Sequence, residues 1–275
     1  MKSLPSILAL VIALSVTGCF QIDKNVQVKP DGSGTITETI TMGSAMITQM
    51  KAMASGFGDA AGGAGAKAKG FELLDEAKLK EEAKKMGEGV TFVSAKKITA
   101  PEREGYTAIY AFTDINKLKL STNPPDIGGG DMKMTGKGES EPVTFALAKG
   151  KTAELTVTTP AMKAPAKTRE EAAADATQEA MNEAMLPMMQ QMFKDMRMTM
   201  SIEVIGKITA TNAANKEGSK VTMLDVDFNK ILADPAKMKA MTKIKDPNSA
   251  EAKAFLKTVP GVKVETTNPV KISFQ

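Results

Sequence analysis

The single cysteine, Cys19, is the residue whose type and position most clearly allow covalent chemistry. It stands directly after a short apolar run over residues 7–16, with the small residues Thr17 and Gly18 in between. A thiol in this position can be alkylated by a diacylglyceryl group, and the chain can then be cut between Gly18 and Cys19. We therefore predict Cys19 as a lipidation site and the bond before it as a cleavage site.

The first eighteen residues have the layout of a signal peptide. Lys2 supplies a positive charge, and residues 7–16 form an apolar stretch interrupted only by Ser15. A retained transmembrane helix needs about 20 apolar residues, roughly twice this length. Ordinary secretory cleavage favours an Ala-x-Ala site, which is absent, and it would leave an unpaired thiol in an oxidising compartment. We expect residues 1–18 to be a lipoprotein signal peptide and residues 19–24 to be a lipidated tether.

The sequence VTGC at residues 16–19 resembles the bacterial lipobox, in which Leu, a small residue and Gly or Ala precede the cysteine. Val16 stands in place of the commoner Leu. The resemblance implies diacylglyceryl transfer to the Cys19 sulfur, cleavage before Cys19, and association with a membrane through that lipid. In enterobacterial sorting, an Asp after the cysteine retains a lipoprotein at the inner membrane. Phe20 takes that place here, which implies the outer membrane, with the body in the periplasm or on the cell surface.

The composition argues against catalysis and against nucleic-acid binding. The chain has no His, which removes the usual general base, the Ser-His and Cys-His nucleophile systems and the ordinary zinc sites. With no Trp and two Tyr, it also lacks stacking platforms for bases. The neighbouring carboxylates are expected on solvated surfaces, and they are Glu81 with Glu82, Glu102 with Glu104, and Glu170 with Glu171. We expect no enzyme, no metal, no cofactor and no nucleic-acid partner.

Methionine is unusually frequent, with 20 in the chain. Two groups have the spacing of one helix face: Met42, Met46, Met50 and Met53, and then Met181, Met185, Met188 or Met189, Met192 and Met196. Methionine fills irregular gaps and lines adaptable apolar surfaces, so these groups are expected to pack in the core or to line a groove for an apolar ligand. A thioether site for Cu(I) is a further alternative, which the lack of His disfavours. Pro187 should kink or break the second helix.

The elements that position these residues form a repeated order. The sequence KITA occurs at residues 97–100 and again at 207–210. Each copy follows a helix-like stretch and an alternating strand, and each precedes a polar turn and a second strand. Hairpin signals also precede each helical stretch, around PDGSG at residues 30–34 and around Lys149 and Gly150. The prediction is an α+β fold of two related β-β-α-β-β units with antiparallel sheets, plus a C-terminal helix and strand.

The predicted division of the chain follows from these signals. It comprises a first unit at residues 25–121 with a flexible Gly- and Ala-rich stretch at 55–70, a linker at 122–140, a second unit at 141–233, and a basic C-terminal helix and strand at 234–275. The last helix is expected to start after a cap at Ser249 and to run through Lys257. The lysines of this end can meet phosphate or carboxylate groups of an envelope partner or form a solvated surface, and they include Lys237, Lys239, Lys243, Lys245, Lys253 and Lys257.

The turn VKPDGSG at residues 28–34 and the passage over residues 193–212 resemble the mycobacterial LppM-like envelope lipoproteins. In that passage Ile205 and Gly206 stand where a Pro-Gly pair is more usual. The resemblance implies an α+β envelope lipoprotein without a demonstrated catalytic site, and it transfers no functional residues. We therefore expect a lipid-anchored, non-catalytic binding module for an apolar ligand or a partner segment. The alternative is a structural or assembly protein of the envelope without a ligand pocket.

Overall fold

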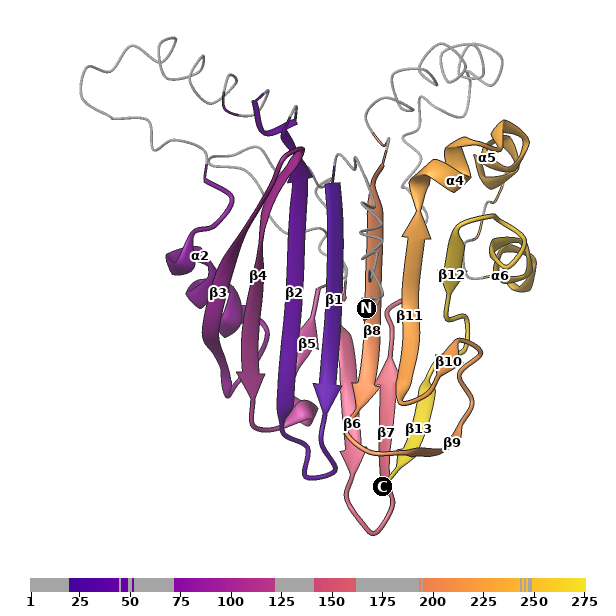
Figure 1. Ribbon diagram of the computed structural model, residues 1–275. Helices are drawn as coiled ribbons and strands as arrows, with labels where there is room; N and C mark the ends of the chain where they lie inside the picture. Colours follow the sequence, from indigo (N-terminus) through magenta and orange to yellow (C-terminus); the bar gives the residue numbers. More distant parts are fainter. Residues whose placement is uncertain are drawn as a thin grey trace, which may run out of the picture.

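The computed structural model describes residues 20–44, 46–48, 51, 72–121, 141–161, 193, 195–242, 244, 246 and 249–275. Strands make up most of the regular secondary structure in this part of the chain (Figure 1). The strands are β1 (Phe20–Val28), β2 (Gly34–Gly43), β3 (Val90–Ala100), β4 (Arg103–Phe112), β5 (Lys119–Leu120), β6 (Val143–Ala148), β7 (Ala153–Thr158), β8 (Arg197–Val204), β9 (Ile208–Thr211), β10 (Lys216–Glu217), β11 (Lys220–Asp227), β12 (Val262–Val264) and β13 (Val270–Phe274). The helices are α2 (Glu76–Lys85), the 3-10 turn η1 (Ile115–Lys117), α4 (Phe228–Leu232), α5 (Pro235–Thr242) and α6 (Ala250–Leu256).

The strands form two sheets. The large sheet has eight strands in the order β10-β11-β8-β1-β2-β4-β3, with β12 paired to β11. The small sheet has five, in the order β5-β6-β7-β13-β9. The pairing between β1 and β8 is parallel, whereas the other pairings among the described strands are antiparallel. Figure 1 shows the small sheet lying behind the lower half of the large one.

The core lies between the two sheets because side chains alternate along each strand. In β1 and β2, Val26, Val28, Ile36 and Ile40 are fully buried on the face turned toward the small sheet. The small sheet contributes alternating buried residues to this core, which include Leu155, Val157, Ile272 and Phe274. Helix α2 adds Leu79, Ala83 and Met86 to the same core. The α+β class that the sequence predicted is confirmed.

The predicted hairpins are present, and the strands of the second predicted unit are divided between the two sheets. Strands β1 and β2 pair around the turn at Gly32, and β6 pairs with β7. Strands β8 and β11 come from the second predicted unit, yet they join the large sheet beside β1. The hairpin β6 and β7 from that same unit lies in the small sheet. Long-range pairing of buried strand faces therefore divides residues 141–233 between two sheets.

The two KITA copies occupy different places in the fold. The first copy ends β3 and pairs with β4 at the edge of the large sheet. The second copy runs into β9, which pairs with β13 in the small sheet. The difference begins at Gly206, whose positive φ of 142° takes the chain from β8 toward β9 and whose Cα faces the backbone of Gln275. Identical letters thus do not mark equivalent positions.

The residues predicted as a tether are part of the sheet. Strand β1 begins at Phe20, so residues 20–24 are paired with β2 rather than free. Lys24 is tolerated within the strand because it forms an ion pair with Glu38 on β2. The sequence prediction was accurate at the other end of the chain, where Ser249 caps α6 and Lys257 ends it.

Candidate functional site

One face of the large sheet is lined by polar side chains. Residues that alternate with the buried ones point away from the core, and the registers of five neighbouring strands align them in rows. Read from β4 to β11, the rows are Gly105, Thr41, Gln21, Arg197 and Asp227; Thr107, Thr39, Asp23, Thr199 and Asp225; Ile109, Thr37, Asn25, Ser201 and Thr222; and Ala111, Thr35, Gln27, Glu203 and Lys220. We call this surface the polar face.

A hollow of about 370 Å³ lies on the polar face. It is lined mainly by side chains of the first three rows, with Arg103 from the start of β4 at one end and Lys220 from the start of β11 at the other. Its volume is in the range of small-molecule sites, but those sites are usually more apolar. Hydroxyl, amide and charged groups dominate its walls, so a ligand here would be held by hydrogen bonds and charge.

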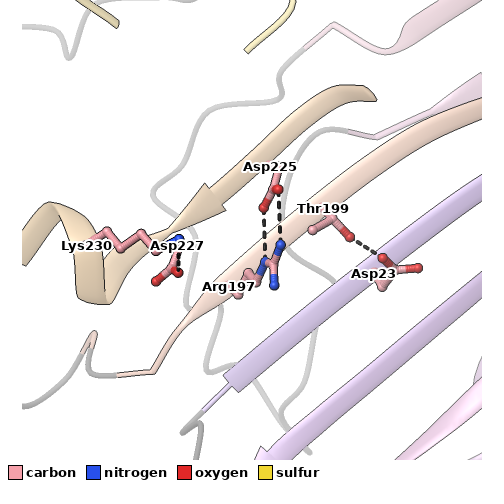
Figure 2. Close-up of polar contacts among 6 residues, drawn as sticks. All are labelled: Asp23, Arg197, Thr199, Asp225, Asp227 and Lys230. Carbon is pink, nitrogen blue, oxygen red and sulfur yellow. Dashed lines mark hydrogen bonds and ion pairs between the residues drawn. The ribbon is translucent and has the colours of Figure 1, made fainter. Parts of the chain in front are cut away.

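Charged groups stand at the β8 and β11 side of the hollow (Figure 2). Arg197 donates from Nε and Nη2 to the two carboxylate oxygens of Asp225, at 3.0 and 3.1 Å, and this hydrogen bonding raises the pKa of Arg197. Thr199 donates its hydroxyl proton to Asp23 on the neighbouring strand. Lys230 of α4 approaches Asp227 at 3.6 Å. The two-pronged Arg197 contact fixes the guanidinium plane at the rim.

Cross-strand hydrogen bonds also fix the middle of the polar face. Asn25 and Gln27 both donate to one oxygen of Glu203, each at 3.0 Å. The bonds from Gln27 and then Asn25 lower the pKa of Glu203, because they favour the ionised carboxylate. Ser201 donates to Asn25 at 2.9 Å. These bonds hold side chains of β1 and β8 in one arrangement before any ligand arrives.

Arg103 is held in the same way at the opposite end of the hollow. It donates from Nη1 to the side-chain oxygen of Gln21, and to the Thr41 hydroxyl at 3.1 Å. The Arg103 guanidinium group therefore links three strands, because Arg103, Gln21 and Thr41 come from β4, β1 and β2. The hollow accordingly has a positioned cation near each of its β4 and β8 walls.

The opposite face of the sheet carries a buried ion pair. Lys24 Nζ lies 2.9 Å from Glu38 Oε2, and the two side chains are only 14% and 4% exposed. Tyr106 and Tyr110 lie on the same face, and burial, followed by the nearby Glu38 charge, raises the pKa of both phenols. Both tyrosines therefore stay neutral, which suits a core position rather than a nucleophile. The Tyr110 hydroxyl is buried without a hydrogen-bond partner among the described residues.

The described residues offer binding groups rather than a metal centre. Within these ranges, no cluster of three or more His, Cys, Asp or Glu side chains could hold a metal ion. The predicted carboxylate pair Glu81 and Glu82 forms exposed ion pairs with Lys84 and Lys85 on α2, as expected for a solvated surface. The candidate site is therefore a preorganised polar surface.

Several of the residues singled out from the sequence lie outside the described residues. They are Cys19, Gly18, Pro187, the carboxylate pair Glu170 and Glu171, and the methionines Met181, Met185, Met188, Met189, Met192, Met50 and Met53. Met196 is described, and it packs partly buried against the core directly before β8. Met42 is buried in β2, and Met46 packs partly buried against the same core, which fits the core interpretation for these two. The apolar groove stays a prediction.

Part of the basic C-terminal end is also described. Lys237 of α5 donates to the Thr258 hydroxyl at 3.0 Å and lies over the Phe255 ring. Lys253 and Lys257 belong to the last turn and the end of α6. The side chains of Lys239, Lys243 and Lys245 lie outside the described residues.

Sequence reasoning missed the polar face. A signal was present in TITETIT at residues 35–41, where a threonine stands at every second position. Such alternation predicts that one face of this strand is exposed to solvent, but it does not identify the neighbouring strands. The other residues of each row come from β4, β1, β8 and β11, and these strands lie far apart in the chain.

Comparisons with known proteins give one structural match. No family model matches the chain, and no curated protein matches it. The solved structure is the NMR structure of the folded domain of Mycobacterium tuberculosis LppM, which is similar at 7% identity with a TM-score of 0.31. The match covers 94% of this chain and 90% of that one. At this identity and TM-score, the similarity assigns neither a family nor a function. Within the described part of the chain, no helix is long and apolar enough to cross a membrane.

Proposed function

We propose that this chain is a lipid-anchored envelope lipoprotein and a non-catalytic binding module, with the polar face as its binding surface. The observation that carries this proposal is the hollow of about 370 Å³ with its pre-bonded polar walls. Fixed hydrogen-bonding groups reduce the ordering that a ligand must impose on the protein when it binds. The lipid anchor rests on the position of Cys19 in the sequence.

The position of β1 relates the hollow to the anchor. Gln21 belongs to the first row of the polar face and lines the hollow, and it is two residues from Cys19. Two extended residues span roughly 7 Å, so a lipid on Cys19 would hold this rim close to the membrane surface. The ligand class that fits these walls is a polar envelope molecule that bears hydroxyl, amide or charged groups. An apolar ligand would instead use the predicted methionine groove around residues 181–196.

The test is native mass spectrometry of the mature protein, extracted from its own membrane in mild detergent. The protein mass reports whether Cys19 carries a diacylglyceryl group, and additional masses report bound molecules. The informative variant combines Thr39→Val and Ser201→Ala, which remove two hydroxyls from the hollow with little change in shape. The matched control is Thr158→Val, an exposed position on β7 of the small sheet.

We expect lipidated Cys19 in all three proteins, and a bound polar molecule in the natural protein and the control that is lost from the double variant. An unmodified Cys19 would refute the anchor. Retention of the same molecule by the double variant would refute the polar face as the binding surface. A natural protein that carries no bound molecule would favour the structural or assembly role instead.

A further inference from the structure

Asp23 brings a negative charge into the hollow of the polar face. Its carboxylate accepts a hydrogen bond from the Thr199 hydroxyl at Oδ2, and in Figure 2 the other carboxylate oxygen points away from Thr199. Asp23 is exposed, and within the described ranges it forms no ion pair with a lysine or an arginine. A hydroxyl partner leaves the charge of a carboxylate in place, so a ligand can neutralise Asp23 from the open side of the hollow.

The other charged groups that line the hollow have partners within the protein. Arg197 binds both carboxylate oxygens of Asp225. Arg103 is bonded to side chains of β1 and β2. Lys220 lies close enough to Glu203 for its charge to add to the hydrogen bonds that lower the pKa of Glu203. The position in the hollow that favours a charged ligand group is therefore that of the β1 carboxylate, and the group that it favours is a cation.

The row that contains Asp23 supplies further acceptors for an ammonium group. Thr39 on β2 and Thr199 on β8 are its cross-strand partners, and neighbouring strands lie about 4.8 Å apart. Thr39 shares a hydrogen bond of 3.0 Å with Thr107, but a hydroxyl oxygen has two lone pairs and can also accept from a ligand. An ammonium group over Asp23 therefore has one carboxylate oxygen and two hydroxyl oxygens within reach, which matches its three N–H donors.

We propose that the hollow binds a molecule that carries a primary ammonium group on a hydroxyl-rich framework, with the ammonium group on Asp23. This ligand class rests on the proposed function of the polar face as a binding surface. The hydroxyl groups of the ligand face Thr41, Ser201 and Thr222, which line the same hollow. Hydroxyl groups both donate and accept hydrogen bonds, so they suit walls made of other hydroxyl and amide groups. Amino sugars have this chemistry.

The experiment titrates three probes into the mature protein in mild detergent at pH 6, where the amine of glucosamine is protonated. The probes are glucosamine, glucose, which has a hydroxyl in place of the ammonium group, and inorganic phosphate. NMR signals of labelled threonine methyl groups report binding at Thr39 and Thr199, and the Thr158 signal on the small sheet verifies the fold. The informative variant is Asp23→Asn, which keeps the shape and an acceptor for Thr199. The matched control is Glu154→Gln, which removes an exposed carboxylate from β7.

We expect glucosamine to shift the Thr39 and Thr199 signals at a concentration at least about tenfold lower than glucose does, because hydrogen bonds between charged groups are the stronger ones. Asp23→Asn should weaken glucosamine binding at least about tenfold and leave glucose binding unchanged. Glu154→Gln should bind both sugars as the natural protein does. Higher salt should weaken the binding of glucosamine only.

Two results would overturn the ammonium site and leave the polar face as a binding surface. The first is equal affinity for the two sugars, with both lost from the Thr39→Val and Ser201→Ala double variant at the Thr199 signal. The second is tighter binding of phosphate than of glucosamine at the same signals. Unchanged glucosamine binding by Asp23→Asn, or no shift of either threonine with any probe, would overturn the inference as well. The proposed function has its own test in the molecule that the natural protein retains from its membrane.

Discussion

Replacing Lys24 by methionine should destabilise the fold strongly at neutral pH. The substitution keeps the volume of the aliphatic stem but leaves the Glu38 carboxylate, 4% exposed, without its cation at 2.9 Å. Removing one member of a buried ion pair typically costs about 3–5 kcal/mol. We therefore expect a loss in this range, or roughly 10 °C in Tm.

A second variant identifies the cause of this loss. The double variant Lys24→Met with Glu38→Leu should recover most of the stability, because it removes both buried charges. Lys80→Met is the control, since Lys80 and Glu76 are both more than half exposed and their pair should contribute under about 0.5 kcal/mol.

The assay is urea unfolding of the mature protein at pH 7, followed by circular dichroism. A double variant as unstable as Lys24→Met would show that the loss comes from packing rather than from a stranded charge.

Three further predictions concern other parts of the sheet. Tyr110→Phe should leave stability unchanged or raise it by up to about 1 kcal/mol, because the Tyr110 hydroxyl is buried without a hydrogen-bond partner among the described residues. A loss above about 1 kcal/mol in urea unfolding would contradict this expectation. Gln27→Ala should raise the pKa of Glu203, since the Gln27 bond is the largest cause of its lowering, and an NMR titration of the side-chain carboxyl carbon that shows no rise would count against it. That lowered pKa means that the Gln27 contribution to stability is present above the unfolded-state value and is lost as pH falls. Gly34→Ala should cost at least about 1–3 kcal/mol of stability, because the new Cβ would lie 1.9 Å from the Gln27 carbonyl oxygen. Gly150→Ala is the control: the nearest atom to its Cβ would lie at 3.3 Å, so its stability should be close to that of the natural protein in the same unfolding assay.

Much of the local structure was predictable because its causes are local. The turn at residues 30–34 forms because Asp31 accepts hydrogen bonds from Ser33 and Gly32 adopts a positive φ of 87°. Helix α6 begins where Ser249 caps the Ala252 N–H. Alternating apolar residues located the strands on both sides of each hairpin. These signals span only a few residues, so they can be recognised without knowledge of the rest of the chain.

The candidate site was not predictable in the same way. Its rows join residues from β4, β2, β1, β8 and β11, and their order depends on the parallel pairing of β1 with β8. Nothing near Gln21 in the sequence indicates that Arg103 and Arg197 will lie beside it. The partners of Asp23 and Lys24, which are Thr199 and Glu38, are likewise supplied by other strands.

The sequence by itself determined the strands, the turns, the last helix and the position of the lone thiol after an apolar segment. The tertiary structure alone decided that β1 starts directly after that thiol, that the second predicted unit is shared between two sheets, and that the polar side chains form one face. The physical reason is that strand partners are chosen by the burial of alternating side chains over long distances in the chain. Turns and caps, by contrast, are fixed by hydrogen bonds within a few residues.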